Sequence, residues 1–234
     1  MTTYLITGAN GQVGSQLVQQ LQAQPNATLI ATDRNTLDIT DRTAVFQAAQ
    51  HHCPHIIINA AAHTAVDKAE SEADLARAIN VNGTRHLAEA AQAIGAAFLH
   101  ISTDYVFDGK GEAPYRETDP TAPQSVYGQT KLDGETAALA ACPRTIILRT
   151  AWVFGEHGGN FVKTMLRLGR ERDTLGIVAD QFGAPTYAGD IAAALITIAQ
   201  HIAAEQLTEY GVYHFSGSPY TSWYGFASEI FRRA

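Results

Sequence analysis

Short apolar runs alternate along this chain with longer amphipathic segments. The runs cover residues 4–6, 28–32, 56–58, 97–101, 145–148 and 212–215, and we expect each to form a strand. The segments between them predict helices over about 15–23, 42–50, 72–94, 160–171, 190–200 and 222–234, with another that begins near 125. Strands joined through helices form a parallel sheet with helices on both faces. The pattern therefore predicts an α/β fold, a doubly wound parallel sheet of the Rossmann type.

Polar residues and one glycine mark the ends of several of these helices. Asp41 and Ser222 each stand at the start of a predicted helix, where a side-chain oxygen can accept a hydrogen bond from a free N–H of the first turn. Gly95 follows the segment 72–94, and a glycine there suits the left-handed residue that ends many helices. We therefore expect helix boundaries at these three positions.

The first predicted strand runs directly into a glycine-rich turn. Glycine allows a sharp turn at Gly8, the close approach of a ligand at Gly11, and close packing of helix on strand at Gly14. The free N–H groups and positive dipole end of the helix that follows favour a bound phosphate. The turn predicts a dinucleotide site, although its first glycine is shifted by one position from the common pattern G-x-G-x-x-G.

The second predicted strand ends at Asp33, about 20 residues beyond the glycine turn. A carboxylate at this place can accept hydrogen bonds from the hydroxyls of an adenosine ribose. Arg34 follows directly, and its guanidinium can pair with a 2′-phosphate. The two residues therefore leave both NADH and NADPH open as cofactors.

The composition limits the class of protein. The chain has 234 residues, of which 46% are hydrophobic, so it can bury a full core. Its formal net charge of -7 argues against a nucleic-acid partner, because affinity for phosphate backbones comes from excess Lys and Arg. No apolar run approaches the ~18 residues of a membrane span, and the N-terminus leads straight into a strand. We expect a cytoplasmic protein without a membrane partner.

A Tyr-x-x-x-Lys pair follows the fourth predicted strand, which ends in a Ser-Thr-Asp sequence that contains Thr103. Tyr127 and Lys131 share one face of the helix that begins near 125. An ammonium near a phenol stabilises the phenolate and would move the tyrosine pKa from about 10 toward neutrality. The segment 105–124 has three prolines and little periodicity, and we expect it to be a lid over a substrate. Hydroxyl, phenol and ammonium would then meet beside a nicotinamide.

The segment 51–55 holds three histidines and a cysteine, which superficially resembles a metal cluster. Its proline, and the lack of a second ligand group at zinc-like spacing, favour a helix end that leads into a buried strand. We expect it to bind no metal.

Six motifs together resemble the extended short-chain dehydrogenase/reductase family. They are G-A-N-G-Q-V-G at 8–14, N-A-A-A-H-T-A-V-D-K-A-E at 59–70, S-T-D-Y-V-F at 102–107, V-Y-G-Q-T-K at 126–131, R-T-A-W-V-F at 149–154 and D-Q-F-G-A-P-T at 180–186. They extend over nearly the whole chain, and their combination is more specific than the glycine turn alone. Within the family, the chain is most similar to the reductases of dTDP-linked 4-keto-6-deoxysugars.

The resemblance implies reduction of the C4 ketone of such a sugar, the step that yields dTDP-L-rhamnose. It implies that Thr103 hydrogen-bonds the keto oxygen, Tyr127 donates the proton, and Lys131 holds the nicotinamide ribose while lowering the tyrosine pKa. The implied substrate contacts are Thr103, Asp104 and Trp152, although Trp152 could instead pack in the core. Together with the glycine turn and the end of the second strand, the expected cofactor contacts are Gly8, Gly11, Gln12, Val13, Gly14, Asp33, Arg34, Asp38, Ile39, Ala62, His63, Thr64, Tyr127 and Lys131.

We expect two regions. Residues 1–150 would form the dinucleotide-binding domain with the catalytic helix, and residues 151–234 would complete the sheet and form part of a small C-terminal lobe that binds the sugar nucleotide. Family members usually continue beyond this length, so we expect that lobe and its substrate contacts to be incomplete.

Two positions bear on the choice among relatives. Related dehydratases follow the catalytic threonine with Asp-Glu, whereas Tyr105 follows Thr103-Asp104 here, so reduction is favoured over dehydration. Some related reductases bind magnesium through glutamates across a dimer, and Gln16 at such a position is a poor ligand, so we expect no metal. A reductase or epimerase of another nucleotide-linked sugar, a non-catalytic NADP-binding regulatory subunit, and a homodimer stay open.

Two sets of polar side chains each have two interpretations. Asn80 and Asn82 lie in the segment predicted as a long helix, where they could be solvated or could face the site. Lys163, Arg167 and Arg170 recur along another helix, where they could bind the diphosphate of a sugar nucleotide or form a solvated stripe.

Overall fold

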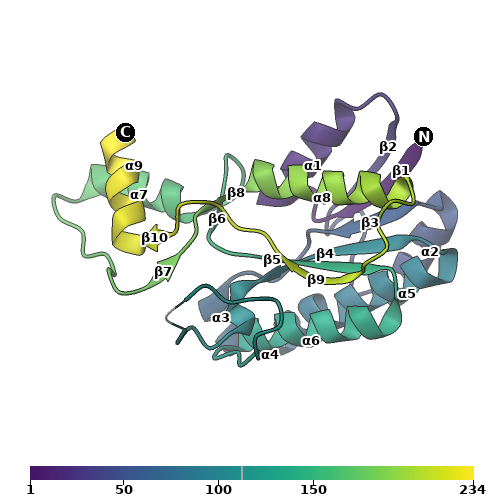
Figure 1. Cartoon of the computed structure of the whole chain (residues 1–234), viewed down its shortest axis with the longest axis horizontal. Helices are drawn as coiled ribbons and strands as arrows, with labels where there is room; N and C mark the ends of the chain where they lie inside the picture. Colours follow the sequence, from purple (N-terminus) through teal and green to yellow (C-terminus); the bar gives the residue numbers. More distant parts are fainter. Residues whose placement is uncertain (112) are drawn as a thin grey trace.

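A six-stranded parallel sheet forms the centre of the molecule (Figure 1). The computed structural model describes residues 1–111 and 113–234. The strand order is β2-β1-β3-β4-β5-β9, with every neighbouring pair parallel. The strands are β1 (Thr2–Thr7), β2 (Ala27–Thr32), β3 (Ile56–Asn59), β4 (Ala97–Thr103), β5 (Thr145–Thr150) and β9 (Gly211–His214). All six predicted strands and the doubly wound fold are confirmed.

Helices cover both faces of this sheet (Figure 1). One face is covered by two helices and the other by three. The helices of the first face are α1 (Gln12–Gln22) and α8 (Ala188–Ala203); those of the second are α2 (Arg42–His52), α5 (Thr84–Ile94) and α6 (Val126–Ala141). Because neither face meets water, the strands have continuous apolar runs instead of an alternation of apolar and polar residues.

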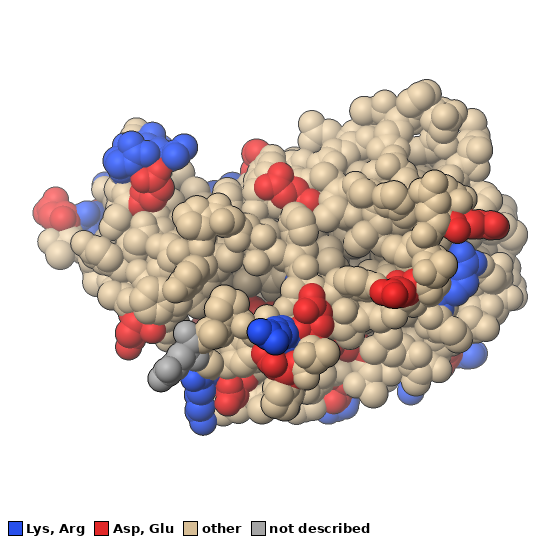
Figure 2. Space-filling view, in the orientation of Figure 1, with Lys and Arg blue, Asp and Glu red and all other residues tan. Residues whose placement is uncertain are grey.

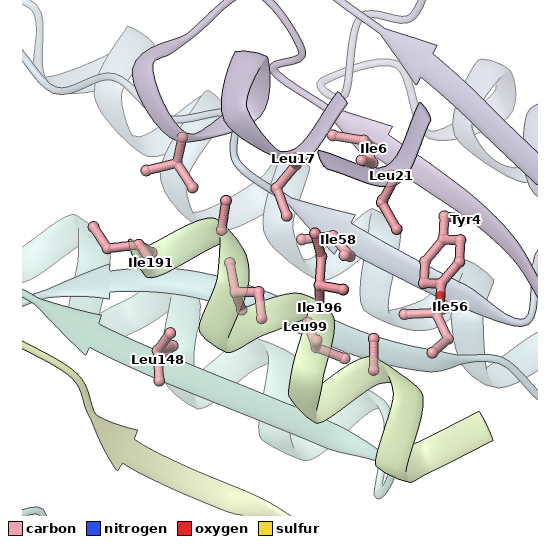
Figure 3. Packing of buried hydrophobic residues seen from close by; sticks show 14 of the residues in the cluster. Tyr4, Ile6, Leu17, Leu21, Ile56, Ile58, Leu99, Leu148, Ile191 and Ile196 are labelled. Carbon is pink, nitrogen blue, oxygen red and sulfur yellow. The ribbon is translucent and has the colours of Figure 1, made fainter. Parts of the chain in front are cut away.

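Side chains of each central strand alternate between the two apolar layers. Leu5 and Ile57 belong to the layer under α2, α5 and α6, while Ile58 belongs to the layer under α1 and α8. Figure 3 shows Leu17 of α1 and Ile196 of α8 beside Ile58 of β3. Each fully buried side chain of this kind contributes about 1.5–3 kcal/mol through removal from water. The sheet therefore holds the ends of its strands in fixed positions.

The predicted helix ends are confirmed. Asp41 and Ser222 each accept a hydrogen bond from a backbone N–H of the first turn of the following helix. Ser125, which was not predicted as a cap, does the same at the start of α6. Gly95 ends α5 in the left-handed conformation, with φ of 72°. These caps were predictable because each depends on the residue type next to the helix.

The helix predicted over 72–94 is present as one continuous helical stretch, but its middle is not an α-helix. It consists of α4 (Ala73–Arg77), the π-helical η1 (Ala78–Gly83) and α5, and a separate short helix, α3 (Val66–Ser71), precedes it. Asn80 explains the wider π turn, because its amide bonds both the N–H and the carbonyl of His63 and the hydroxyl of Thr130. Contacts with distant parts of the chain therefore override the local helical pattern.

A small lobe projects from one end of the sheet (Figure 1). It packs α7 (Phe161–Glu171) against α9 (Trp223–Arg233) around Met165, Ala227 and Ile230. Two short ladders join it to the rest of the chain. They pair β6 (Val153–Phe154) with β8 (Thr186–Tyr187), and β7 (Phe182–Gly183) with β10 (Thr221–Ser222). The lobe thus comes from two segments, separated by α8 and β9 of the main sheet.

Figure 2 shows acidic and basic side chains interspersed over one face of the molecule. On α9, for example, Arg232 and Arg233 both pair with Glu229. Among the helices of the described residues, none has the length and apolar character needed to cross a membrane.

Candidate active site

The glycine turn follows β1, which has β2 on one side and β3 on the other. The chain runs from β1 to β2 in one direction across the sheet and from β1 to β3 in the other, so the strand order reverses at β1. In open parallel sheets, the carboxyl ends of the strands leave a crevice at this place. Gly8 has φ of 71°, and a Cβ on it would stand 2.6 Å from the backbone nitrogen of Ala61. A Cβ on Gly14 would overlap the carbonyl oxygen of Gly8. Glycine is therefore required at both positions by close backbone packing, with the predicted roles of sharp turn and helix contact.

The start of α1 forms a suitable cradle for a pyrophosphate. Gly11 is the N-cap residue and has an extended backbone, and the first helical residues Gln12, Val13 and Gly14 are uncharged. Their N–H groups precede the first intrahelical hydrogen bonds and lie at the positive end of the helix dipole. This backbone arrangement fits the diphosphate of a dinucleotide.

A cleft of about 480 Å³ opens above the carboxyl ends of β1, β3, β4 and β5. It brings together predicted residues from the glycine turn, the loop after β3, the end of β4, and α6. The predicted residues that line it are Gly11, Gln12, Val13, Ala62, Thr64, Thr103, Asp104, Tyr127, Lys131 and Trp152. Segments far apart in the sequence therefore meet at one site.

Other predicted cofactor residues lie outside this cleft. Asp33 lines a second hollow of about 530 Å³, on the opposite side of the glycine turn. Arg34 and Asp38 are exposed, and Ile39 is buried in the core beneath α2 and α5. His63 is half-buried, and its backbone is held by Asn80. The cleft and the hollow at Asp33 therefore suit an elongated ligand that occupies both.

The carboxylate of Asp33 is held in a fixed position. Asn10 donates to Oδ2 over 2.6 Å, and the backbone N–H groups of Asn35 and Thr36 donate to Oδ1. Hydrogen bonds, chiefly from the backbone of Thr36, lower the pKa of Asp33. A negative charge therefore stands beside the place where ribose hydroxyls are expected.

Thr103 and Asp104 form a hydrogen-bonded pair at the end of β4. Thr103 Oγ1 donates to Asp104 Oδ1 over 3.1 Å and accepts from the backbone N–H of Tyr105. Burial raises the pKa of Asp104 to about 6. This carboxyl can therefore exist in both protonation states near neutral pH.

Tyr127 is buried, and its pKa lies above the ordinary value, contrary to the prediction that Lys131 lowers it. Burial is the main cause; a hydrogen bond with Thr103 lowers the pKa, and the nearby Asp104 raises it. The ring of Tyr105 packs edge-on against that of Tyr127, with centroids 5.4 Å apart. The phenol is therefore protonated at neutral pH, which is the state that a proton donor needs.

Lys131 is 2% exposed, at the base of the cleft. Its Nζ donates to the carbonyl oxygen of Ile101 over 2.7 Å and lies 3.0 Å from Nε2 of His100. Burial lowers the pKa of Lys131 to about 8, and the negative charge of Glu135 opposes this shift. Glu135 itself forms a buried bidentate ion pair with Arg149 of β5.

The two asparagines of the π segment have different surroundings. Asn80 is fully buried and holds the loop at His63 through its side-chain amide. It therefore positions a cleft-lining loop, so the solvated interpretation is wrong for Asn80. Asn82 is partly exposed and accepts a hydrogen bond from Arg85.

The basic side chains of α7 lie outside the cleft. Lys163 donates to the carbonyl oxygens of Glu156 and Gly158, and Arg167 pairs with Glu171. Arg170 is exposed. Lys163 thus stabilises the loop before α7, and diphosphate binding by this face stays a prediction.

Trp152 packs against another aromatic side chain and also lines the cleft, while its stacking on a ligand stays a prediction. It lines the cleft, and one face of its indole stacks on Trp223 with ring centroids 3.5 Å apart. Its backbone has φ of 47°, in the left-handed region that non-glycine residues rarely adopt. Gly183 also packs against the indole, since a Cβ on it would overlap Cε2 of Trp152.

Several cleft residues were not predicted as contacts. Tyr105 follows Asp104 directly, so its position at a strand end was the available signal. Ser102, Thr150, Gly158 and Gly159 also line the cleft. The Gly158-Gly159 doublet was visible in the sequence, but its closeness to the glycine turn depends on a contact of Gln12 with Asn160.

The predicted lid begins at the cleft and continues to the edge of the sheet. Tyr105 lines the cleft, whereas Glu117 accepts a hydrogen bond from the backbone N–H of His214 in β9. Glu112, which belongs to the same segment, lies outside the described residues. Closure of this segment over a substrate stays a prediction.

The suspected metal residues have other contacts. His51 and His52 end α2, and Cys53 caps it in the left-handed conformation. Gln16 donates to the carboxylate of Glu156 over 3.1 Å. In residues 1–111 and 113–234, no group of three or more His, Cys, Asp or Glu side chains is arranged to hold a metal ion.

Comparisons with known proteins agree in fold and family. A family model described as RmlD substrate binding domain matches residues 1–234. A dTDP-4-dehydrorhamnose reductase of Aggregatibacter actinomycetemcomitans is 51% identical over 234 residues, which are all of this chain and 80% of that protein.

Two solved structures are also similar over nearly the whole chain. A dTDP-4-dehydrorhamnose reductase of Clostridium acetobutylicum has a TM-score of 0.93 and 46% identity, covering 98% of this chain and 79% of that one. The reductase of Bacillus anthracis in complex with NADP has a TM-score of 0.91 and 42% identity, covering 99% of this chain and 80% of that one.

Proposed function

The chain belongs to the family described as RmlD substrate binding domain, and from this premise we propose that it reduces the C4 keto group of dTDP-4-dehydro-L-rhamnose to give dTDP-L-rhamnose. NADPH or NADH would be the reductant. The protein is thus an NAD(P)H-dependent oxidoreductase of nucleotide-sugar biosynthesis.

One observation supports the proposal more than any other. The cleft that begins at the glycine turn also contains the hydroxyl of Thr103, the phenol of Tyr127 and the amine of Lys131. A proton donor and a hydrogen-bond donor therefore stand beside the place where the family binds a dinucleotide. A carbonyl group in this cleft could be protonated as it is reduced.

The residues around the turn fit a dinucleotide. Backbone N–H groups from Gln12 to Gly14 would hold its diphosphate, and Asp33 would accept hydrogen bonds from its adenosine ribose. The Bacillus anthracis relative is described as a complex with NADP, which supports NADPH as a cofactor here. When bound, NADPH or NADH would supply the hydride for C4 of the sugar.

Tyr127 would donate the proton to the keto oxygen. Its raised pKa keeps the phenol protonated before reaction. Thr103 would hydrogen-bond the same oxygen as it gains negative charge. Lys131 lies one turn further along α6, where its ammonium would stabilise the phenolate that the proton transfer leaves behind. The phenolate would then regain a proton from solvent.

Substrate contacts are proposed for Asp104 and Trp152. The half-buried carboxyl of Asp104 lies beside Thr103 and can accept hydrogen bonds from sugar hydroxyls. The indole of Trp152, which lines the cleft, can pack on the sugar or the base. A cytoplasmic location and a homodimer remain predictions.

An epimerase of a nucleotide-linked sugar is the alternative on this fold. A reductase consumes one NADPH for each sugar reduced, whereas an epimerase restores its cofactor in every cycle. Cofactor oxidation should therefore be followed with a panel of 4-keto nucleotide sugars, using NADPH and NADH in turn. We expect stoichiometric oxidation with dTDP-4-dehydro-L-rhamnose and much slower oxidation with UDP- or GDP-linked ketones; the reverse order would reject the proposed substrate.

A further inference from the structure

A chain of hydrogen bonds runs beneath the cleft and ends at Lys131. It connects Asn59 at the end of β3, His100 in β4 and Lys131 in α6. Asn59 and His100 are both 0% exposed. The nitrogen atoms are 3.1 Å apart between Asn59 Nδ2 and His100 Nδ1, and 3.0 Å apart between His100 Nε2 and Lys131 Nζ. Because no bulk water reaches these groups, each donor must face an acceptor within the chain.

The amide of Asn59 has one orientation that satisfies its neighbours. The backbone N–H of Ala61 points at Oδ1 over 3.0 Å, and a backbone N–H can only donate. The hydroxyl of Thr7 donates to the same oxygen over 2.8 Å. Turning the amide around would set its NH₂ group against the N–H of Ala61. Asn59 therefore presents Nδ2, a donor, to His100.

The orientation of Asn59 determines the tautomer of His100. Burial, together with the positive charge of Lys131, holds the pKa of His100 well below its usual value, so the imidazole is neutral and has one N–H. Its Nδ1 receives the N–H of Asn59 and must supply a lone pair. The single ring proton is therefore on Nε2.

The N–H at Nε2 points at the side-chain nitrogen of Lys131. An ammonium has three N–H groups and no lone pair, so it would meet this N–H donor with another donor. A neutral amine has a lone pair that accepts the N–H of His100, and it can still donate to the carbonyl oxygen of Ile101. With the amine, every group from Ala61 to Lys131 has a partner of the right kind.

We propose that Asn59 and His100 are positioning residues that act on the protonation state of Lys131: they present an N–H to its Nζ and so favour the amine over the ammonium. The catalytic meaning of this inference rests on the proposed function, because there the ammonium of Lys131 stabilises the phenolate of Tyr127. These hydrogen bonds are present in the free protein and need no substrate.

The charged groups around Lys131 are consistent with this effect. Burial lowers the pKa of Lys131 to about 8, in the direction that the N–H of His100 favours. Glu135 acts in the opposite direction, but it shares its charge with Arg149. On the cleft side stand the neutral phenol of Tyr127 and the carboxyl of Asp104, whose pKa is about 6.

The chain of hydrogen bonds does not serve as a proton wire. The side-chain amide of Asn59 would have to lose a proton to pass one to His100, and amides do not ionise near neutral pH. The pair therefore sets a preference at Lys131 without carrying protons to it. It follows that activity should fall on the alkaline side as Lys131 loses its proton, near pH 8 instead of above about 10.

Nitrogen NMR of the histidine rings tests the tautomer directly in the free protein. The resonances of His100 are those lost in His100→Gln. We expect His100 to have a protonated Nε2 and an unprotonated Nδ1, both below and above the titration of Lys131. A protonated Nδ1 in the wild-type protein would overturn the inference, whether or not the protein is a reductase.

Carbon NMR at Cε of the four lysines gives the pKa of Lys131, assigned by Lys131→Met. The variant Asn59→Asp replaces Nδ2 by an oxygen, so the proton of His100 should move to Nδ1 and its Nε2 should accept from the ammonium. We expect the pKa of Lys131 to rise by about one unit or more, with the same shift in the alkaline limb of kcat.

The carboxylate that Asn59→Asp introduces also raises the lysine pKa through its charge, so the tautomer must be measured in the same sample. A rise without movement of the proton to Nδ1 would mean that charge alone acts and would overturn the inference. The control Thr84→Val removes the other acceptor of Asn59 Nδ2 and leaves the polarity of the chain unchanged. It should keep the wild-type tautomer of His100 and the wild-type pKa of Lys131. A proton on Nδ1 of His100 in this control would count against the role of Asn59.

A wild-type protein that does not oxidise NADPH with the 4-keto sugar would instead reject the proposed function, and the tautomer of His100 would be unaffected by that result.

Discussion

The hydroxyl of Thr103 donates to the carboxyl of Asp104, with 3.1 Å between Oγ1 and Oδ1. Burial raises the pKa of Asp104 to about 6. A threonine that must hydrogen-bond a ketone is therefore engaged with a neighbour until substrate arrives. The protonation state of Asp104 therefore affects whether the hydroxyl of Thr103 is free to donate to a carbonyl group.

The first prediction concerns the pH dependence of stability. Because Asp104 holds its proton more tightly in the folded protein, its contribution to the free energy of unfolding falls as pH rises from about 4 through about 6. Asp104→Asn removes this loss and still accepts from Thr103. We expect the variant to be more stable than wild type by about 1–2 kcal/mol at about pH 8, after allowance for solvent screening, and by little at about pH 4. Denaturant unfolding at the two pH values measures it, and an equal difference at both would contradict the assignment.

The second prediction concerns the proton donor. Tyr127→Phe keeps the buried ring but removes the hydroxyl, so kcat should fall roughly 10²-fold or more while the Kd for NADPH stays close to wild type. Steady-state kinetics and fluorescence titration of NADPH give the two quantities. The matched control is Tyr213→Phe, whose hydroxyl donates to the carbonyl of Glu209 away from the cleft and should not affect kcat. Near-normal turnover of Tyr127→Phe would show that Tyr127 is not the proton donor.

The third prediction separates the glycine turn from general stability. A Cβ on Gly14 overlaps the carbonyl of Gly8, so Gly14→Ala should lower the free energy of unfolding by about 1–3 kcal/mol and weaken NADPH binding. Gly95→Ala should cost about 1–2 kcal/mol through its left-handed backbone alone, because a Cβ there has no described neighbour within 4 Å. Unfolding curves and NADPH titrations compare the two. Equal NADPH affinities of Gly14→Ala and Gly95→Ala would show that the glycine turn does not bind the cofactor.

The fourth prediction concerns cofactor preference. The ionised carboxylate of Asp33 would repel a 2′-phosphate on the adenosine ribose. Asp33→Asn should therefore raise the ratio of kcat/KM for NADPH to that for NADH, by about tenfold. The control Asp41→Asn keeps a good N-cap for α2 and should leave the ratio unchanged. An unaltered ratio of kcat/KM in Asp33→Asn would mean that the adenosine ribose does not bind beside Asp33.

Features that depend on neighbouring residues were predictable from the sequence. The strands are continuous apolar runs because both sheet faces are covered, and the caps at Asp41 and Ser222 need only the right side chain before a helix. The carboxyl ends of parallel strands meet at one edge of the sheet, so Thr103 was expected beside the glycine turn. The cleft contains it there.

Features that depend on distant contacts were not predictable in the same way. The π-helical stretch inside the helix predicted over 72–94 accompanies the bonds of Asn80 to His63 and Thr130, which no local pattern indicates. The stacking of Trp152 on Trp223 likewise joins two separate segments of the small lobe. Helical spacing predicts which residues share a face, but it does not show what packs against that face.

Burial explains the error in the pKa of Tyr127. The spacing of Tyr127 and Lys131 predicts that the ammonium lowers the tyrosine pKa. In the folded protein, burial acts on both groups and disfavours each charged form, so the tyrosine pKa is raised and the lysine pKa is lowered. A sequence shows which charges are near one another along a helix, whereas desolvation depends on the whole packed structure.

Transfer of deuterium tests the central claim most directly. The protein should be incubated with dTDP-4-dehydro-L-rhamnose and NADPH that bears deuterium at the transferable position of the nicotinamide, and the product examined by mass spectrometry and NMR. We predict dTDP-L-rhamnose with one deuterium on C4 of the sugar, formed by wild type and scarcely by Tyr127→Phe. An unreduced sugar, or a product without deuterium at C4, would contradict the account.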